Sequence, residues 1–106
     1  MRVEFLYWED CPSYARALLR LREVLSEEGI NSEVEVIRVD TEDQAQRLRF
    51  PGSPTIRFEG ADIAPADESY GLTCRVYLTD DRRVTPLPGK EMIRRALRSA
   101  VRTQEV

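Results

Sequence analysis

Histidine is absent from this sequence of 106 residues, and cysteine occurs only at Cys11 and Cys74. Without histidine there is no Cys-His catalytic pair, no histidine general base and no usual zinc ligand set. Reactive chemistry therefore falls to thiols or carboxylates. Two cysteines are too few for a disulfide-dense scaffold, and the N-terminus lacks a signal-peptide pattern. We expect catalytic or redox-sensing thiols rather than a permanent cross-link.

Long apolar runs and an excess of positive charge are also missing. No stretch approaches the apolar length of a transmembrane helix, and the net charge of −3 argues against general nucleic-acid binding. An apolar content of 42% with 33% charged residues is ordinary for a soluble globular protein. We expect one domain over residues 1–106 in the cytoplasm, with no membrane partner, no nucleic-acid partner and no bound metal.

The most informative stretch runs from Phe5 to Tyr14. Apolar strand formers end abruptly after Trp8, and Pro12 then occupies a position where a first helical residue needs no N–H. Cys11 is therefore expected at a helix N-terminus, which favours a thiolate over a thiol. The neighbouring acids, Glu9 and Asp10, oppose that effect. The alternative is that Cys11 is a small buried hydrophobic residue, as free cysteines often are.

Periodicity along the rest of the chain predicts alternating strands and helices. Thr41 and Gln44 match a capping box at the start of a short helix, and Pro54 opens the third strand. The segment from Gly60 to Thr73 is too long for a simple hairpin connection and is predicted to be a surface excursion. The predicted strands are 3–8, 33–39, 55–59 and 74–79, and the predicted helices are 12–28, the short helix that ends before Pro51, and a last helix after Gly89.

This order, β-α-β-α-β-β-α, resembles the thioredoxin fold over nearly the whole chain. The segment Tyr7 to Tyr14 is similar to the Cys-Pro-x-Cys segment of glutaredoxins, and Gly52-Ser53-Pro54-Thr55 is similar to the cis-proline segment of that family. The resemblance implies an α/β fold in which three helices flank a four-stranded mixed sheet with two parallel strands and one antiparallel hairpin.

The resemblance also implies a site. In that family the cis-proline packs against the active-site cysteine, and its neighbours offer backbone groups to the extended segment of a substrate. Carried over, Cys11 is the catalytic residue and Pro54 stands opposite it. The substrate-binding residues implied are Trp8, Pro12, Tyr14, Ser53, Pro54 and Thr55.

The sequence departs from the family at Tyr14, which stands where a second cysteine is expected. A dithiol cycle within Cys-Pro-Ser-Tyr is thereby excluded, and monothiol chemistry is expected. The Cys11 thiolate attacks a disulfide or accepts glutathione, and another thiol resolves the mixed disulfide. Glutathione is then a co-substrate and no other cofactor is implied. The expected partners are protein or small-molecule thiols and disulfides, and no oligomeric state is predicted.

Cys74 lies at the start of the predicted fourth strand, 63 positions after Cys11. The third strand runs away from Cys11 for about 17 Å at 3.3 Å per residue, so a simple hairpin starts the fourth strand at the far end. A disulfide requires Cα atoms within about 7 Å. We therefore expect Cys74 to be structural, and to act as a resolving cysteine only if the excursion from Gly60 to Thr73 doubles back.

Two other functions compete with a redox protein. One is a thioredoxin-fold binding module that has lost turnover and uses the groove of Cys11 and Pro54 to hold a partner. The other rests on a resemblance to thioredoxin-like proteins linked with mercury handling, and would use Cys11 and Cys74 to bind a soft metal.

Overall fold

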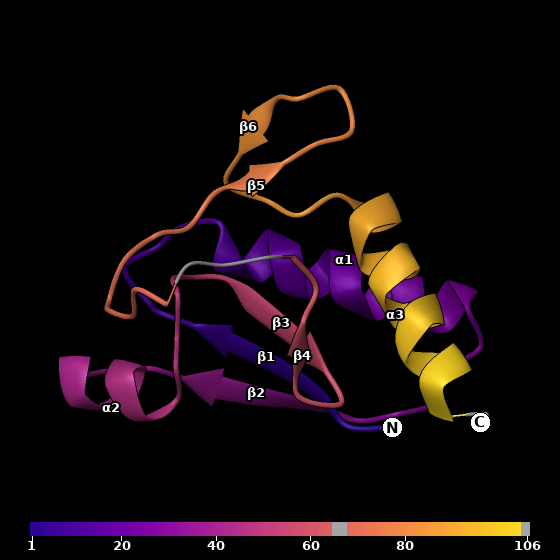
Figure 1. Ribbon diagram of the computed structural model, residues 1–106, viewed down its shortest axis with the longest axis horizontal. Helices are drawn as coiled ribbons and strands as arrows, with labels where there is room; N and C mark the ends of the chain where they lie inside the picture. The colour runs from indigo at the N-terminus through magenta and orange to yellow at the C-terminus, as the bar shows by residue number, and fades with distance from the viewer. Residues whose placement is uncertain (65–67, 105–106) are drawn as a thin grey trace.

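A four-stranded mixed sheet forms the centre of the computed structural model, which describes residues 1–64 and 68–104 (Figure 1). β1 pairs in parallel with β2 and antiparallel with β3, and β3 forms an antiparallel hairpin with β4. With three helices around this sheet, the predicted α/β class is confirmed. In spatial order the strands are β2 (Val34–Arg38), β1 (Val3–Tyr7), β3 (Thr55–Phe58) and β4 (Ala61–Asp62).

The helices α1 (Tyr14–Glu27) and α3 (Lys90–Gln104) cover one face of the sheet. Both carry apolar residues at three- and four-residue steps, which gives each helix one buried stripe. Gly29, with φ of 69°, follows the last turn of α1 in the left-handed conformation that commonly ends a helix. The main core comprises Val3, Phe5, Ala17, Leu21, Val24, Leu25, Ile56, Phe58, Leu87, Ile93 and Leu97.

A short helix, α2 (Glu42–Arg47), packs at the opposite face. The predicted capping box is confirmed: Thr41 Oγ1 accepts a hydrogen bond from the Gln44 N–H, and Gln44 Oε1 accepts one from the Thr41 N–H, both at 3.1 Å. A second and smaller core lies where α2 packs on the sheet. That core comprises Leu6, Val39, Ala45 and Phe50.

The predicted fourth strand at 74–79 is wrong. Glu59 and Gly60 have φ of 54° and 81° and reverse the chain directly after β3, so Ala61–Asp62 becomes the fourth strand of the sheet. Two residues of the predicted strand form β5 (Tyr77–Leu78), which pairs only with β6 (Val84–Thr85) in a separate hairpin that projects from the body in Figure 1. Within the described part of the chain there are therefore two more strands before α3 than predicted. Residues 65–67 of the expected excursion lie outside the described residues.

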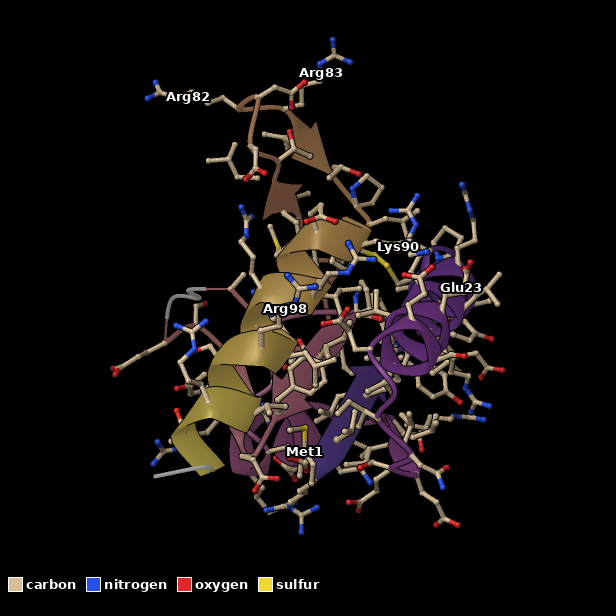
Figure 2. The ribbon with its side chains drawn as sticks, turned by 90° about the vertical axis from the view of Figure 1, so that its right-hand side faces the viewer. Met1, Glu23, Arg82, Arg83, Lys90 and Arg98 are labelled. Atoms are coloured by element: carbon tan, nitrogen blue, oxygen red, sulfur yellow. A yellow bond between two sulfur atoms is a disulfide. The ribbon has the colours of Figure 1, made fainter. Side chains whose placement is uncertain are left out.

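Ion pairs join the C-terminal half of α1 to α3. Lys90 Nζ lies 2.7 Å from a carboxylate oxygen of Glu27, and Arg94 Nη2 lies 2.6 Å from the other. Arg98 Nε contacts Glu28 at 2.6 Å. Figure 2 shows the same arrangement at Lys90 and Glu23, whose charged atoms are 3.8 Å apart. Hydrogen bonds from Lys90 and Arg94 lower the pKa of Glu27, and a hydrogen bond from Arg98 lowers the pKa of Glu28.

These lowered pKa values predict acid-sensitive stability. A carboxylate with a lowered pKa in the folded state stabilises the protein above its unfolded value, here 4.5, and that contribution disappears as the pH falls through the folded value. We expect Glu28→Gln to lower the free energy of unfolding more at pH 7 than at pH 3, measured by urea denaturation. Added salt should shrink the difference. Glu33→Gln, at an exposed residue outside these ion pairs, is the control. An equal loss at both pH values in Glu28→Gln would contradict the assignment.

Candidate functional site

Cys11 lies in the turn between β1 and α1, as predicted. Its N–H donates to the Trp8 carbonyl at 3.1 Å, and its residue surface is only 2% exposed. Ser13 is the N-cap residue of α1, yet its side chain makes no capping hydrogen bond. Ser13 Oγ instead lies 3.6 Å from Cys11 Sγ. A hydroxyl is thus placed where it could donate to a Cys11 thiolate.

The Ser53-Pro54 segment forms the second side of the site. Its peptide bond is cis, as the resemblance implied. Cys11 Sγ lies 3.5 Å from the Ser53 carbonyl oxygen, and Ser53 Oγ accepts a hydrogen bond from the Trp8 N–H at 2.9 Å. The two stretches singled out from the sequence are therefore in direct contact.

Cys74 is joined to Cys11 in a disulfide, with the two Cα atoms 5.8 Å apart. The expectation that Cys74 stays at the far end of the sheet is wrong. Cys74 lies beside Cys11 because the chain reverses early, at Gly60, and then returns toward Cys11. On this return path the Gly71 N–H donates to the Phe50 carbonyl at 3.0 Å, and the Leu72 N–H donates to Glu42 Oε1 at 3.0 Å.

The backbone of Ser53 holds the segment around Cys74 in place. The Ser53 N–H donates to the Thr73 carbonyl at 2.8 Å, and the Arg75 N–H donates to the Ser53 carbonyl at 3.0 Å. Ser53 and Cys74 thus form an isolated parallel bridge. The resemblance implied that these groups of Ser53 would pair with a substrate. In this structure they pair with the chain's own segment.

Two buried side chains anchor the same segment independently of the sulfurs. Arg75 Nη1 lies 2.8 Å from Asp62 Oδ2 and donates to Thr55 Oγ1 at 3.3 Å. The Arg75 guanidinium also lies 4.5 Å from the centre of the Tyr77 ring, and the Tyr77 hydroxyl donates to the Pro54 carbonyl at 2.5 Å. Burial raises the pKa of Tyr77, so its hydroxyl stays a donor. These contacts would keep Cys74 beside Cys11 after reduction.

Sequence reasoning missed Arg75 and Tyr77 as parts of the site. The segment 74–79 was predicted as a strand, but its continuous apolar run Val76–Leu78 did not indicate which side chains face inward. The structure buries Arg75 and Tyr77 and exposes Cys74, Val76 and Leu78.

The residues predicted to bind substrate differ in accessibility. Pro12 is exposed, and Trp8 is half-buried against the core beside α2. Tyr14 is half-buried and stacks on Tyr7, with ring centres 4.5 Å apart. The other three are buried: Ser53, Pro54 and Thr55, the last of which donates from Oγ1 to the Gly52 carbonyl at 2.6 Å.

Charges near Cys11 are partly neutralised. Glu9 and Asp10 are exposed, and Glu9 pairs with Arg38 Nη2 at 3.1 Å. This pairing weakens one of the two negative charges expected to oppose a thiolate. Within residues 1–64 and 68–104 no three His, Cys, Asp or Glu side chains gather as a metal site, and no helix is long and apolar enough to cross a membrane.

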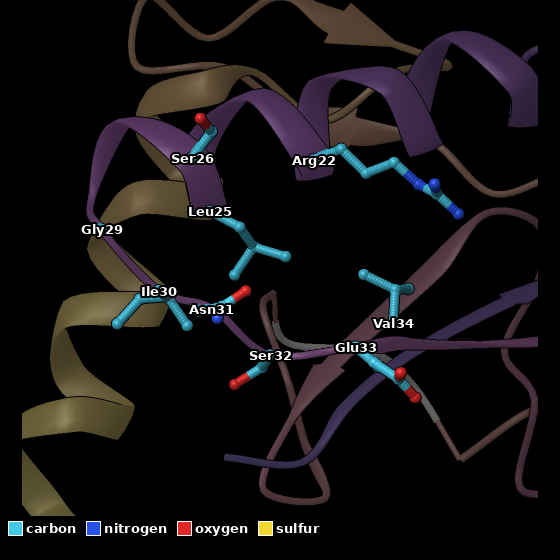
Figure 3. A pocket seen from close by; sticks show the side chains of 9 residues that line it. All are labelled: Arg22, Leu25, Ser26, Gly29, Ile30, Asn31, Ser32, Glu33 and Val34. Atoms are coloured by element: carbon cyan, nitrogen blue, oxygen red, sulfur yellow. The ribbon is translucent and has the colours of Figure 1, made fainter.

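A cavity of about 630 Å³ lies at the other end of α1 (Figure 3). It is bounded by the last turns of α1 and by the segment that leads into β2, so it is remote from Cys11, which precedes α1. Its walls mix apolar and polar groups, and no thiol faces it. The lining residues are Arg22, Leu25, Ser26, Gly29, Ile30, Asn31, Ser32, Glu33 and Val34.

Gly52 is required by the close approach of the two segments. Its φ is 139°, and a Cβ at this position would lie 2.8 Å from Arg75 Cβ and 3.0 Å from the Arg75 nitrogen. We expect Gly52→Ala to push the segment at Cys74 away from Ser53 and to lower the free energy of unfolding by about 1–3 kcal/mol, the range of other strained or overpacked core changes.

Gly60→Ala is the matched control, because Gly60 also has a positive φ of 81° but nothing within 4 Å of an added Cβ. Urea denaturation measures both losses, and hydrogen exchange at the Arg75 amide reports the local opening. Equal losses in the two variants, with the Arg75 amide still protected in Gly52→Ala, would contradict the close-approach argument.

Comparison of the chain with protein-family models, with curated proteins and with solved structures finds no match. The candidate site is therefore defined by its own geometry: a buried cysteine, a cis-proline segment and a second cysteine held on that segment.

Proposed function

We propose that this chain is a thioredoxin-like thiol–disulfide exchange protein whose redox pair is Cys11 and Cys74. The observation that carries the proposal is the pairing of these two cysteines directly beside Ser53-Pro54. Monothiol chemistry was expected because no second cysteine lies near Cys11 in the sequence. Cys74 supplies that second thiol from a distant segment, so a dithiol cycle within one chain becomes the better mechanism.

The arrangement of the elements supports the thioredoxin-like part of the proposal. The strand order is β2-β1-β3-β4, α1 and α3 lie on one face, and α2 lies at the other. Cys11 precedes α1, and Pro54 precedes β3. Both positions agree with the resemblance, whereas the two-stranded β5–β6 hairpin is an addition to it.

The proposed cycle uses ordinary thiol chemistry. A thiolate from a partner attacks the Cys11–Cys74 disulfide, which forms a mixed disulfide and releases one protein thiolate. A second partner thiol then attacks the mixed disulfide and releases the partner as a disulfide. Two partner thiols are oxidised, and the protein disulfide is reduced to two thiols. Glutathione, or a protein with two thiols, has the chemistry to serve as the partner.

Features around the sulfurs favour exchange over a purely structural cross-link. Cys74 is exposed, so the disulfide is open to attack from outside. The contacts of Arg75 and Tyr77 keep the two thiols close in the reduced state, which gives them a high effective concentration and favours reoxidation. Ser13 Oγ lies close enough to stabilise a thiolate on Cys11.

Soft-metal binding is a second candidate, because the same convergence of two sulfurs would suit a two-coordinate ion such as Cu(I) or Hg(II) in the reduced protein. Equal Cu(I) affinity in wild type and Cys74→Ala would rule out shared binding by the pair.

The redox proposal predicts a requirement for both cysteines. We expect the reduced wild type to form the Cys11–Cys74 disulfide in a glutathione redox buffer and to catalyse reduction of insulin by dithiothreitol. Cys11→Ser and Cys74→Ser should each lower that rate at least tenfold, because neither can complete the internal cycle. The rate is followed by the turbidity of the reduced insulin, with circular dichroism as a check that each variant is folded.

Ser26→Ala, an exposed change on α1, is the matched control and should keep the wild-type rate. Turnover by wild type no faster than by the variant that lacks both cysteines would overturn the redox proposal. In that case, capture of a folded partner with equal affinity by wild type and Cys11→Ser would favour the binding module.

A further inference from the structure

We propose that a partner thiolate attacks the sulfur of Cys74. Cys11 is then the internal sulfur that leaves in this step and later re-forms the disulfide. This assignment rests on the proposed function and reverses the roles expected from the sequence, in which Cys11 attacks first. Every exchange with a partner would then pass through a mixed disulfide on Cys74.

The exposure of the two cysteines is the first support for this order. Cys11 is 2% exposed, whereas Cys74 is exposed. The difference follows from the alternation of the extended segment. Arg75 and Tyr77 are 8% and 2% exposed and are anchored inside, whereas the alternate residues Cys74, Val76 and Leu78 are exposed. The orientation of Cys74 is thus set by two buried anchors.

The surroundings of Cys11 are the second support. An incoming thiolate approaches a disulfide along the S–S axis, from the side of the attacked sulfur opposite its partner. Around Cys11 Sγ, the Ser53 carbonyl oxygen at 3.5 Å and Ser13 Oγ at 3.6 Å leave little room for a partner. The sulfur of Cys74 is therefore the more accessible target. Accessibility is one of the factors that decide which sulfur of a disulfide is attacked.

A partner thiolate forms a bond to Cys74 Sγ, and the electron pair of the Cys11–Cys74 bond moves to Cys11 Sγ, which leaves as a thiolate. The Ser13 hydroxyl can donate to that thiolate, and a stabilised thiolate is a better leaving group. A second partner thiolate then attacks the partner sulfur of the mixed disulfide, and Cys74 leaves. In the reverse direction, the Cys74 thiolate attacks a partner disulfide and Cys11 resolves it.

Trapping in the wild type tests the order. Oxidised protein is mixed with one equivalent of glutathione, quenched with acid at short times, and mapped by mass spectrometry. We expect at least ten times more glutathione on Cys74 than on Cys11. Because Cys11 can rapidly expel glutathione from Cys74, the same mixture is quenched over a series of times, and the earliest ratio is the one compared.

Single-cysteine variants provide a second measurement that does not depend on trapping. Reduced Cys11→Ser and Cys74→Ser react with 5,5′-dithiobis(2-nitrobenzoate), and separately with a pyridyl disulfide linked to a large dextran. Dividing the dextran rate by the small-probe rate removes intrinsic thiol reactivity. We expect this quotient to be at least tenfold larger for Cys74, present in Cys11→Ser, than for Cys11, present in Cys74→Ser.

The outcomes separate the two proposals. Glutathione found mainly on Cys11, or equal quotients for the two variants, would overturn the assignment of roles while leaving exchange by the pair intact. Failure of the wild-type disulfide to exchange with glutathione at all would instead overturn the proposed function. Ser13→Ala should slow the first attack on the disulfide severalfold without moving the trapped glutathione, whereas Ser26→Ala should do neither.

Discussion

The pairing of Ser53 with the segment around Cys74 is the contact on which the site depends. Both backbone groups of Ser53 are used, the N–H toward Thr73 and the carbonyl toward Arg75. Ser53 also touches Cys11 through its carbonyl oxygen. One residue therefore positions both sulfurs, which lie 63 positions apart in the chain. The contact exists only because Gly52 has no Cβ to meet Arg75.

The ion pair between the buried Arg75 and the half-buried Asp62 adds specificity to this contact. A buried guanidinium without a partner would be strongly destabilising, so Arg75 must enter at the place where Asp62 and Thr55 can receive it. A slip of one residue would expose Arg75 and Tyr77 and bury Cys74 and Val76. The ion pair thus fixes the register of the segment, and the register decides that Cys74 faces outward.

Local sequence patterns were sufficient for the helices and the first three strands, but not for β4, the β5–β6 hairpin or the second half of the site. The apolar stripes of α1 and α3, the capping box at Thr41, and the positions of Cys11 and Pro54 all follow from neighbouring residues. The location of Cys74 does not, because it depends on long-range contacts: Gly71 with Phe50, and Leu72 with Glu42. The extended character of 74–78 was predictable; its partners, Ser53 and β6, were not.

A disulfide between distant segments couples cysteine oxidation to folding. In a Cys-x-x-Cys motif the two thiols share one turn, and the cross-link closes a very small loop. Here it closes a loop of 63 positions, which in a chain-entropy model stabilises the folded state by about 4 kcal/mol. This coupling is reciprocal by thermodynamic linkage. The free energy by which the disulfide stabilises the folded state equals the free energy by which folding favours formation of the disulfide. The contacts of Ser53, Arg75 and Tyr77 that hold Cys74 in place are therefore also determinants of how readily the pair is reduced.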